Sequence, residues 1–176
     1  GPIGPTFTIS LPVRPGERAN NAFGLNPFGV HIGDHGLDGH PGWDVEYALG
    51  ADVVAVAAGT VQSVLTTEGG QSFGIQITHV VGGREAYRSI YGVKTLAGGV
   101  TAGAAIAAGQ PLGTVASYTR TIGTITVTYA FTHFQLDDFS ANEGSTNPNA
   151  VSPLPFLDVG ARQAIDHLRK RKPWRA

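Results

Sequence analysis

The chain has 176 residues, of which 41% are hydrophobic and 14% are charged. This length and apolar share predict one globular domain with a packed core, and they exclude an intrinsically disordered chain. The absence of cysteine excludes disulfides and thiolate metal sites. The net charge is −1, and the excess of acidic over basic residues within 1–157 argues against a nucleic-acid partner. No apolar run is long enough to cross a bilayer, so no transmembrane segment is expected.

The first part of the chain is punctuated by proline and glycine. Residues 1–20 contain four prolines and predict an N-terminal arm, in which Phe7–Leu11 is a candidate edge strand. Residues 21–157 are expected to form the main domain. It begins with a loop over 21–39 that is rich in Asn, Gly, His and Asp, and that carries His31 and His35. We expect this loop to lie at the rim of a site.

Short strands joined by tight turns are predicted from residue 52 onward, because Gly, Val, Ile and Thr are frequent. The runs 53–57 and 60–66 predict one hairpin, and the runs 74–80 and 85–93 predict a second. Thr124–Leu136 is the longest strand candidate. Because side chains alternate between the faces of a strand, one face should carry Ile125, Val127, Tyr129, Phe131, His133 and Gln135. His133 is then a polar exception on a mostly apolar face.

One helix is predicted near the C-terminal end, over 158–168. Asp158 is placed to cap its first turn, and the apolar stripe consists of Ala161, Ala164, Ile165 and Leu168. Six of the twelve Lys and Arg residues lie in 158–176, so this segment is assigned as a helix with a basic tail. These patterns together predict a mostly-β chain with long loops and one C-terminal helix.

The stretch His40-Pro41-Gly42-Trp43-Asp44 is the strongest candidate for chemistry. It places an imidazole and a carboxylate four residues apart, just before a Val- and Ala-rich run. Imidazole nitrogen and carboxylate oxygen are ligand types that zinc accepts, and a catalytic zinc needs three protein ligands and one open position. The stretch supplies two of these ligands and leaves the third to be found elsewhere in the chain.

Several motifs occur in an order that resembles the lysostaphin-like, or LytM-type, zinc endopeptidases, which cut peptide cross-links in bacterial peptidoglycan. The resemblance covers about residues 23–157. It is carried by His40–Asp44 with the run ending in Gly59-Thr60-Val61, then by Gly74–His79, Tyr91-Gly92-Val93, Val100–Val115, His133-Phe134-Gln135 and Pro153–Leu157. The resemblance implies an antiparallel β-sandwich of the lysostaphin type, which is a duplicated hybrid motif. It also implies a peptidoglycan or peptide ligand and an extracytoplasmic location (periplasmic, cell-wall or secreted).

The resemblance also implies a set of zinc ligands and the loss of two catalytic histidines. His40, Asp44 and His133 correspond to the family's three zinc ligands. Val93 stands where the family has the His of its Tyr-x-His motif, and Phe131 stands where it has the first His of His-x-His. The family uses these two histidines to handle the proton and the oxyanion. We therefore expect zinc binding with a degenerate catalytic apparatus.

Three hypotheses follow from these residues. The first is a zinc-binding domain of the cell envelope that hydrolyses weakly or not at all and acts in binding or regulation. The second is an active zinc metallopeptidase whose catalytic groups have moved, with Tyr129, His31 and His35 as candidates. The third treats the triad as a coincidence in a sugar- or peptide-binding sandwich or a phosphotransfer domain of related architecture.

Overall fold

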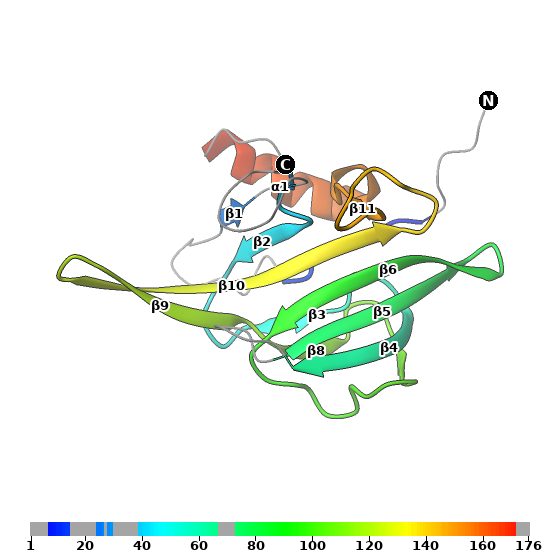
Figure 1. Cartoon of the computed structure of the whole chain (residues 1–176), viewed down its shortest axis with the longest axis horizontal. Helices are drawn as coiled ribbons and strands as arrows, with labels where there is room; N and C mark the ends of the chain where they lie inside the picture. Colours follow the sequence, from blue (N-terminus) through cyan, green and yellow to red (C-terminus); the bar gives the residue numbers. More distant parts are fainter. Residues whose placement is uncertain (1–6, 15–23, 27, 30–38, 67–72, 172–176) are drawn as a thin grey trace.

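Two antiparallel sheets of very different size form the body of the protein (Figure 1). The computed structural model describes residues 7–14, 24–26, 28–29, 39–66 and 73–171, and the side chains at 24–26, 118, 120, 129 and 167–171 lie outside this description. Within the described residues the larger sheet has nine strands and the smaller sheet has two. The main path of the larger sheet runs in the order β1-β2-β10-β6-β5-β4-β7.

The long strand β10 is the axis of the larger sheet, because four other strands pair with it. It pairs with β2 and β6 along the main path, and β9 and β11 also pair with it. The strands of this sheet are β1 (Gly24–Asn26), β2 (Trp43–Glu46), β4 (Gly59–Thr66), β5 (Phe73–Val81), β6 (Arg84–Val93), β7 (Ala105–Ile106), β9 (Ala116–Ile122), β10 (Ile125–Asp138) and β11 (Ala150–Val151). The smaller sheet pairs β3 (Asp52–Val54) with β8 (Pro111–Thr114).

One hydrophobic core joins the two sheets. Val53 of β3 and Leu112 of β8 belong to the same buried cluster as Ile77 of β5, Tyr91 of β6 and Phe134 of β10. All five are fully buried. The larger sheet therefore buries one face against the smaller sheet, and the mostly-β antiparallel sandwich with one helix near the C-terminal end is confirmed.

The N-terminal segment completes this core. Phe7, Ile9 and Leu11 alternate with the polar residues Thr8 and Ser10, and Val13 follows a buried proline. Each of these four apolar side chains is at most 7% exposed. Ile9 forms a single bridge with Leu157. The predicted edge strand over Phe7–Leu11 is thus reduced to one bridge, because its backbone bonds go to segments outside the sheets, such as the bond from the Ser10 N–H to the Val56 carbonyl.

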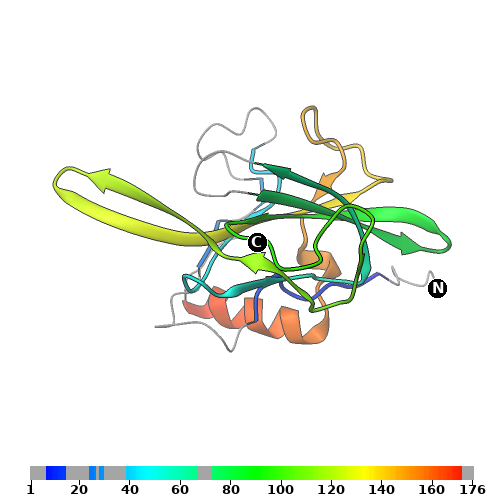
Figure 2. The same ribbon diagram turned by 90° about the horizontal axis from the view of Figure 1, so that it is seen from below.

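The C-terminal helix α1 (Val159–Arg171) follows a short 3₁₀ turn over Leu154–Phe156. Figure 2 shows it on the side of the molecule that carries the smaller sheet. The Ala161 N–H donates to Asp158 Oδ1 at 2.8 Å, which is the predicted N-cap. Ile165 is fully buried and Ala161 is 6% exposed, so the predicted apolar stripe packs on the core.

The first predicted hairpin is wrong. The runs 53–57 and 60–66 do not pair with each other, because β3 pairs with β8 and β4 pairs with β5. Between them the chain passes from one sheet to the other through a tightly packed point at Gly59. A Cβ atom there would lie 2.3 Å from the Thr78 carbonyl oxygen, so only glycine fits. The second predicted hairpin is confirmed as β5 and β6.

A strand over 116–122 is not predicted from the sequence, yet β9 pairs with β10 along seven positions from Ala116↔Phe131 to Ile122↔Ile125. The resulting ribbon projects from the body (Figure 1). Ile122 and Ile125 near its tip are 54% and 66% exposed. Among the described side chains near the tip no buried face exists that would produce the apolar alternation from which strands are recognised.

A line of hydrogen bonds crosses the core between the β3–β4 connection and the β5–β6 hairpin. The Val56 N–H donates to Tyr91 Oη at 2.9 Å, and Tyr91 is also hydrogen-bonded to Ser89. Ser89 Oγ lies 2.7 Å from His79 Nε2, and His79 Nδ1 lies 2.7 Å from the Ala58 carbonyl oxygen. The three side chains are at most 1% exposed. This line fixes the connection between the two sheets and gives His79 a structural role.

Candidate metal centre

The register of β2 against β10 places Asp44 directly opposite His133. Along β2, Trp43 and Val45 are fully buried while Asp44 is half-buried, so the two apolar side chains anchor the strand in the core. Because successive side chains alternate between faces, this anchoring turns Asp44 toward the opposite face, where His133 lies. The short apolar-polar alternation Trp43-Asp44-Val45 thus aims the carboxylate.

His40 lies on the loop that leads into β2. Its side chain is fully buried, and its carbonyl accepts the Gly29 N–H at 2.8 Å. Gly42 follows it at the closest approach between this loop and β10, where a Cβ atom would lie 2.1 Å from the Phe134 carbonyl oxygen. Glycine at this position therefore lets the two strands approach closely enough for His40 and Asp44 to reach His133.

The three side chains converge on one point. His133 Nδ1 lies 3.0 Å from Asp44 Oδ1, and His40 Nε2 lies 3.3 Å from the same oxygen. One ligand atom from each residue lies within 4.8 Å of the other two. A tetrahedral zinc with bonds of about 2.0–2.2 Å has ligand–ligand edges of about 3.3–3.6 Å. Two imidazole nitrogens and one carboxylate oxygen at these separations fit a zinc ion.

The cluster is closed on one side and open on the other. The His40 side chain is 0% exposed, whereas the side chains of Asp44 and His133 are 25% and 22% exposed. A cavity of about 170 Å³ borders the His40 side, with Phe28, Pro41 and Glu143 among its lining residues. The arrangement resembles an open rather than a closed zinc site, because water or a ligand can reach it.

Electrostatics favour the charged form of the carboxylate. Burial by itself would raise the pKa of Asp44, but the hydrogen bonds and positive charge offered by His133 and His40 lower the pKa well below its usual value. A carboxylate that stays ionised at neutral pH is ready to accept a cation.

The other predicted site residues fall into two groups. Phe131 is half-buried two residues before His133 on β10, and Val93 is fully buried in the core cluster at the end of β6. Neither side chain can donate or accept a hydrogen bond. The candidates His31 and His35 lie outside the described residues, and for Tyr129 the structure describes the backbone position in β10 but not the side chain.

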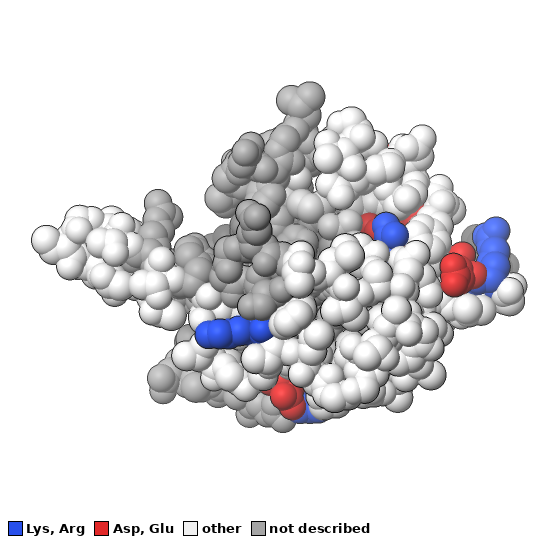
Figure 3. All heavy atoms as spheres, turned by 60° about the horizontal axis from the view of Figure 1, so that its bottom comes forward, with Lys and Arg blue, Asp and Glu red and all other residues white. Residues whose placement is uncertain are grey.

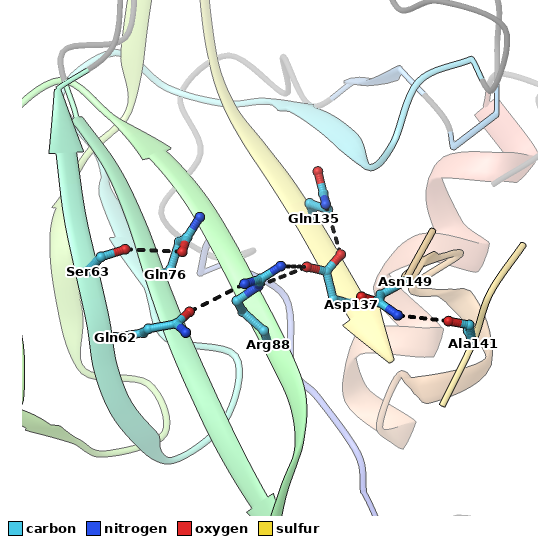
Figure 4. A network of polar contacts seen from close by, with 8 residues as sticks. All are labelled: Gln62, Ser63, Gln76, Arg88, Gln135, Asp137, Ala141 and Asn149. Carbon is cyan, nitrogen blue, oxygen red and sulfur yellow. Dashed lines mark hydrogen bonds and ion pairs between the residues drawn. The ribbon is translucent and has the colours of Figure 1, made fainter. Parts of the chain in front are cut away.

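Two polar residues on the same face of β10 were missed as site candidates. Gln135 and Asp137 follow His133 at the spacing of two that keeps side chains on one face. Asp137 is 2% exposed and is bound by Arg88 of β6 (Figure 4). The signal in the sequence was the continued alternation His133, Gln135, Asp137, which extends the polar face beyond the point where the apolar positions end.

Charged side chains are sparse on the face shown in Figure 3. Over the described residues of this face, Lys, Arg, Asp and Glu lie in small separate groups rather than in a patch of one sign. On this face the described charges therefore form no basic stripe. Among the described residues, no helix combines the length and the apolar character needed to cross a bilayer.

A protein-family model for peptidase family M23 matches residues 38–148, which include all three members of the His–Asp–His cluster. The chain belongs to peptidase family M23. The matched region begins just before His40 and ends after β10, so it contains most of the larger sheet. No curated protein sequence matches the chain.

Several solved structures share this fold. The catalytic domain of the antimicrobial peptidase lysostaphin from Staphylococcus simulans is 22% identical with a TM-score of 0.56, over 80% of this chain and 98% of that domain. Helicobacter pylori Csd3 is 18% identical with a TM-score of 0.56, over 94% of this chain and 40% of that one. A zinc-containing peptidase from Vibrio cholerae is 19% identical with a TM-score of 0.53, over 84% of this chain and 39% of that one. The chain thus spans nearly all of the lysostaphin catalytic domain but only about two fifths of the length of the Helicobacter pylori and Vibrio cholerae chains.

Proposed function

We propose that this chain is a zinc-binding M23 domain of the cell envelope that binds peptidoglycan peptides and hydrolyses them weakly or not at all. The convergence of His40, Asp44 and His133 carries the proposal, because their donor atoms and separations suit zinc. The Vibrio cholerae structure of the same fold is described as zinc-containing, which supports the choice of metal. A bound zinc would polarise a substrate carbonyl or lower the pKa of a bound water.

Weak hydrolysis is proposed because Val93 and Phe131 occupy the two positions at which the family resemblance requires histidine. General acid–base help contributes about 10²–10⁴-fold to a rate, and an oxyanion donor contributes about 10²–10³-fold. Val93 is 0% exposed and packs in the core cluster, so a water molecule cannot take the place of the missing imidazole at this position. A site without these partners favours binding over turnover.

The proposed role also predicts where the protein acts and what it binds. Lysostaphin is named as an antimicrobial peptidase. The lysostaphin-like endopeptidases that the sequence resembles cut peptide cross-links in peptidoglycan. We therefore propose an extracytoplasmic location and a peptidoglycan stem or cross-link peptide as the partner. The open side of the cluster at Asp44 and His133 provides access for such a peptide.

A second candidate function is an active metallopeptidase with relocated catalytic groups. It is favoured by the retention of all three ligand positions together with an accessible side, since a purely structural zinc would be enclosed. The candidate groups are those of Tyr129, His31 and His35. Replacing the responsible group by phenylalanine should abolish turnover while zinc remains bound.

The deciding experiment measures zinc content and peptidoglycan cleavage together. The wild type is expected to hold one zinc per chain after dialysis and to release no soluble peptides from purified peptidoglycan. His133→Ala is expected to lose the zinc. His167→Ala, which changes a histidine of α1 that is not one of the three proposed ligands, is the matched control and should retain it. Chelator-sensitive cleavage at an ordinary peptidase rate would select the second function, and absence of zinc from the wild type would reject both.

A further inference from the structure

Three side chains on the neighbouring strands β6 and β10 form a directed network (Figure 4), and β10 also carries His133 of the metal cluster. Arg88 of β6 donates to Asp137 Oδ2 through Nε at 2.9 Å and through Nη2 at 2.7 Å. Gln135 of β10 donates through Nε2 to Asp137 Oδ1 at 2.8 Å. Both oxygens of this buried carboxylate are thereby used. The guanidinium compensates the charge that burial would otherwise make costly.

This network fixes which way the Gln135 amide faces. An amide can in general be turned over, because its oxygen and nitrogen have almost the same shape. Here the partner is a carboxylate held by a guanidinium, and an ionised carboxylate only accepts hydrogen bonds. The NH₂ group of Gln135 must therefore face Asp137, and the carbonyl oxygen Oε1 must face away from it. Figure 4 shows Oε1 on the side of the amide that lies away from Asp137.

The acceptor atom of the Gln135 amide is not sealed from solvent. Gln135 is 7% exposed as a residue. Within the described chain Oε1 accepts no hydrogen bond, and it is not among the side-chain atoms that are sealed from solvent without a partner. A buried side chain thus presents one oriented and accessible oxygen. Two residues along a strand span about 6.6 Å, so this oxygen lies next to the metal-binding end of the same face.

We propose that Gln135 is a positioning residue that accepts, through Oε1, a hydrogen bond from a backbone N–H of a peptide lying beside the metal cluster. The inference rests on the proposed function, since it assumes a peptide ligand at that cluster. Arg88 and Asp137 act through Gln135 by holding its acceptor in place. A fixed acceptor at this place selects ligands with a free N–H, such as a secondary amide or an amine. It disfavours an N-methylated peptide bond at the same position, because that bond has no hydrogen to donate.

Gln76 of β5 provides a matched contrast on the same face. It lies opposite Ile90, and Ile90 lies opposite Gln135, so the two glutamines belong to one row across the sheet. Its Oε1 receives a hydrogen bond from Ser63 Oγ at 3.1 Å. A hydroxyl both donates and accepts, so Ser63 does not fix the direction of the Gln76 amide. Gln76 lacks the fixed polarity of Gln135.

The test combines protein variants with N-methylated peptides. The full chain, loaded with zinc, is titrated by NMR with tetraglycine and with the set of tetraglycines that carry a single N-methyl group. In the wild type, N-methylation of one particular amide should weaken binding by about 3- to 10-fold, the range expected for one hydrogen bond. In Gln135→Met this specific penalty should vanish, whereas in Gln76→Met it should remain. Comparing the N-methylation penalty in the wild type and in the variant measures the contact between Gln135 and the peptide N–H, because a general loss of stability would affect both peptides equally.

Asp137→Asn is an independent test of the relay. With its oxygen held by Arg88, the introduced amide presents NH₂ to Gln135, which then turns its own NH₂ toward the ligand. The preference for a free N–H over an N-methyl group should disappear although Gln135 is unchanged. A penalty that persists in Gln135→Met, or zinc binding without tetraglycine binding by the wild type, overturns the inference and leaves the metal site standing. Failure of the wild type to bind zinc overturns the proposed function as well.

Discussion

Gly42→Ala should damage the metal cluster without touching a ligand. The added Cβ would lie 2.1 Å from the Phe134 carbonyl oxygen and 2.9 Å from Gln135 Cα, whereas ordinary van der Waals contact begins at 3.4 Å. These atoms belong to the β10 backbone and cannot rotate away, so the loop and β10 must separate by about 1.3 Å. The backbone φ of Gly42 is not in the left-handed region, and the cost is therefore purely one of space.

Two quantities follow from this separation. Overpacking of this kind costs about 1–3 kcal/mol of stability, and a loss of about 2 kcal/mol lowers Tm by about 4–8 °C in a chain of this size. Metal–ligand distances tolerate only about 0.2 Å of error. Since Asp44 follows Gly42 by two residues and faces His133 across the strands, zinc affinity should fall by about 10- to 100-fold, as for residues that support metal ligands.

The assay is thermal unfolding of the zinc-free protein together with competition for zinc against a chromogenic chelator. Gly98→Ala is the matched control, because a Cβ there has nothing within 4 Å and its φ is not left-handed. It should change neither Tm nor zinc affinity. If Gly42→Ala binds zinc as tightly as Gly98→Ala does, the close approach of the two strands is not what assembles the cluster, and the reasoning fails.

Three further predictions concern stability. Burial lowers the pKa of His79 below its ordinary value of 6.5, although a hydrogen bond to the Ala58 carbonyl opposes this shift. As the pH falls, the unfolded chain therefore binds a proton at this histidine before the folded chain does. The free energy of unfolding should then decrease below about pH 6.5, by at most about 1.4 kcal/mol per pH unit. Urea midpoints at several pH values should show a shallower decrease for His79→Gln, and equal slopes would contradict the assignment. Tyr91→Phe leaves the buried Val56 N–H without its acceptor and should cost about 1–3 kcal/mol by urea unfolding at pH 7. Asp158→Ala removes the cap of α1 and should cost about 1 kcal/mol, with Asp158→Asn largely retaining it.

The ligand cluster was predictable because each member leaves a mark in the sequence. His40 and Asp44 flank a turn before an apolar run, and His133 interrupts an apolar face of the longest strand. The structure brings these three together through the β2–β10 register. The register itself was not predictable from local patterns, since it links residues that are far apart in the chain, and only the resemblance to a family connected them.

The second half of the polar face was harder to predict for a different reason. Arg88 and Asp137 are ordinary surface residue types, and their pairing depends on β6 lying next to β10. The false hairpin over 53–66 has the same cause. Its two runs are each strand-like, but whether two strands pair with each other or with other strands is decided by packing across the core, such as the contact of Gly59 with Thr78.

The hydrogen bonds through His79 all run in one direction. The Val56 N–H can only donate and the Ala58 carbonyl can only accept, so Tyr91, Ser89 and His79 must each pass one hydrogen along from the first to the last. A second proton on the imidazole would force the Ser89 hydroxyl to reverse, and the Tyr91 hydrogen would then face a donor. The reversed order ends at an amide that cannot accept, so one hydrogen is left without an acceptor. All hydrogen bonds of this connection are therefore satisfied only while the imidazole is neutral, so protonation of His79 weakens the junction between the two sheets.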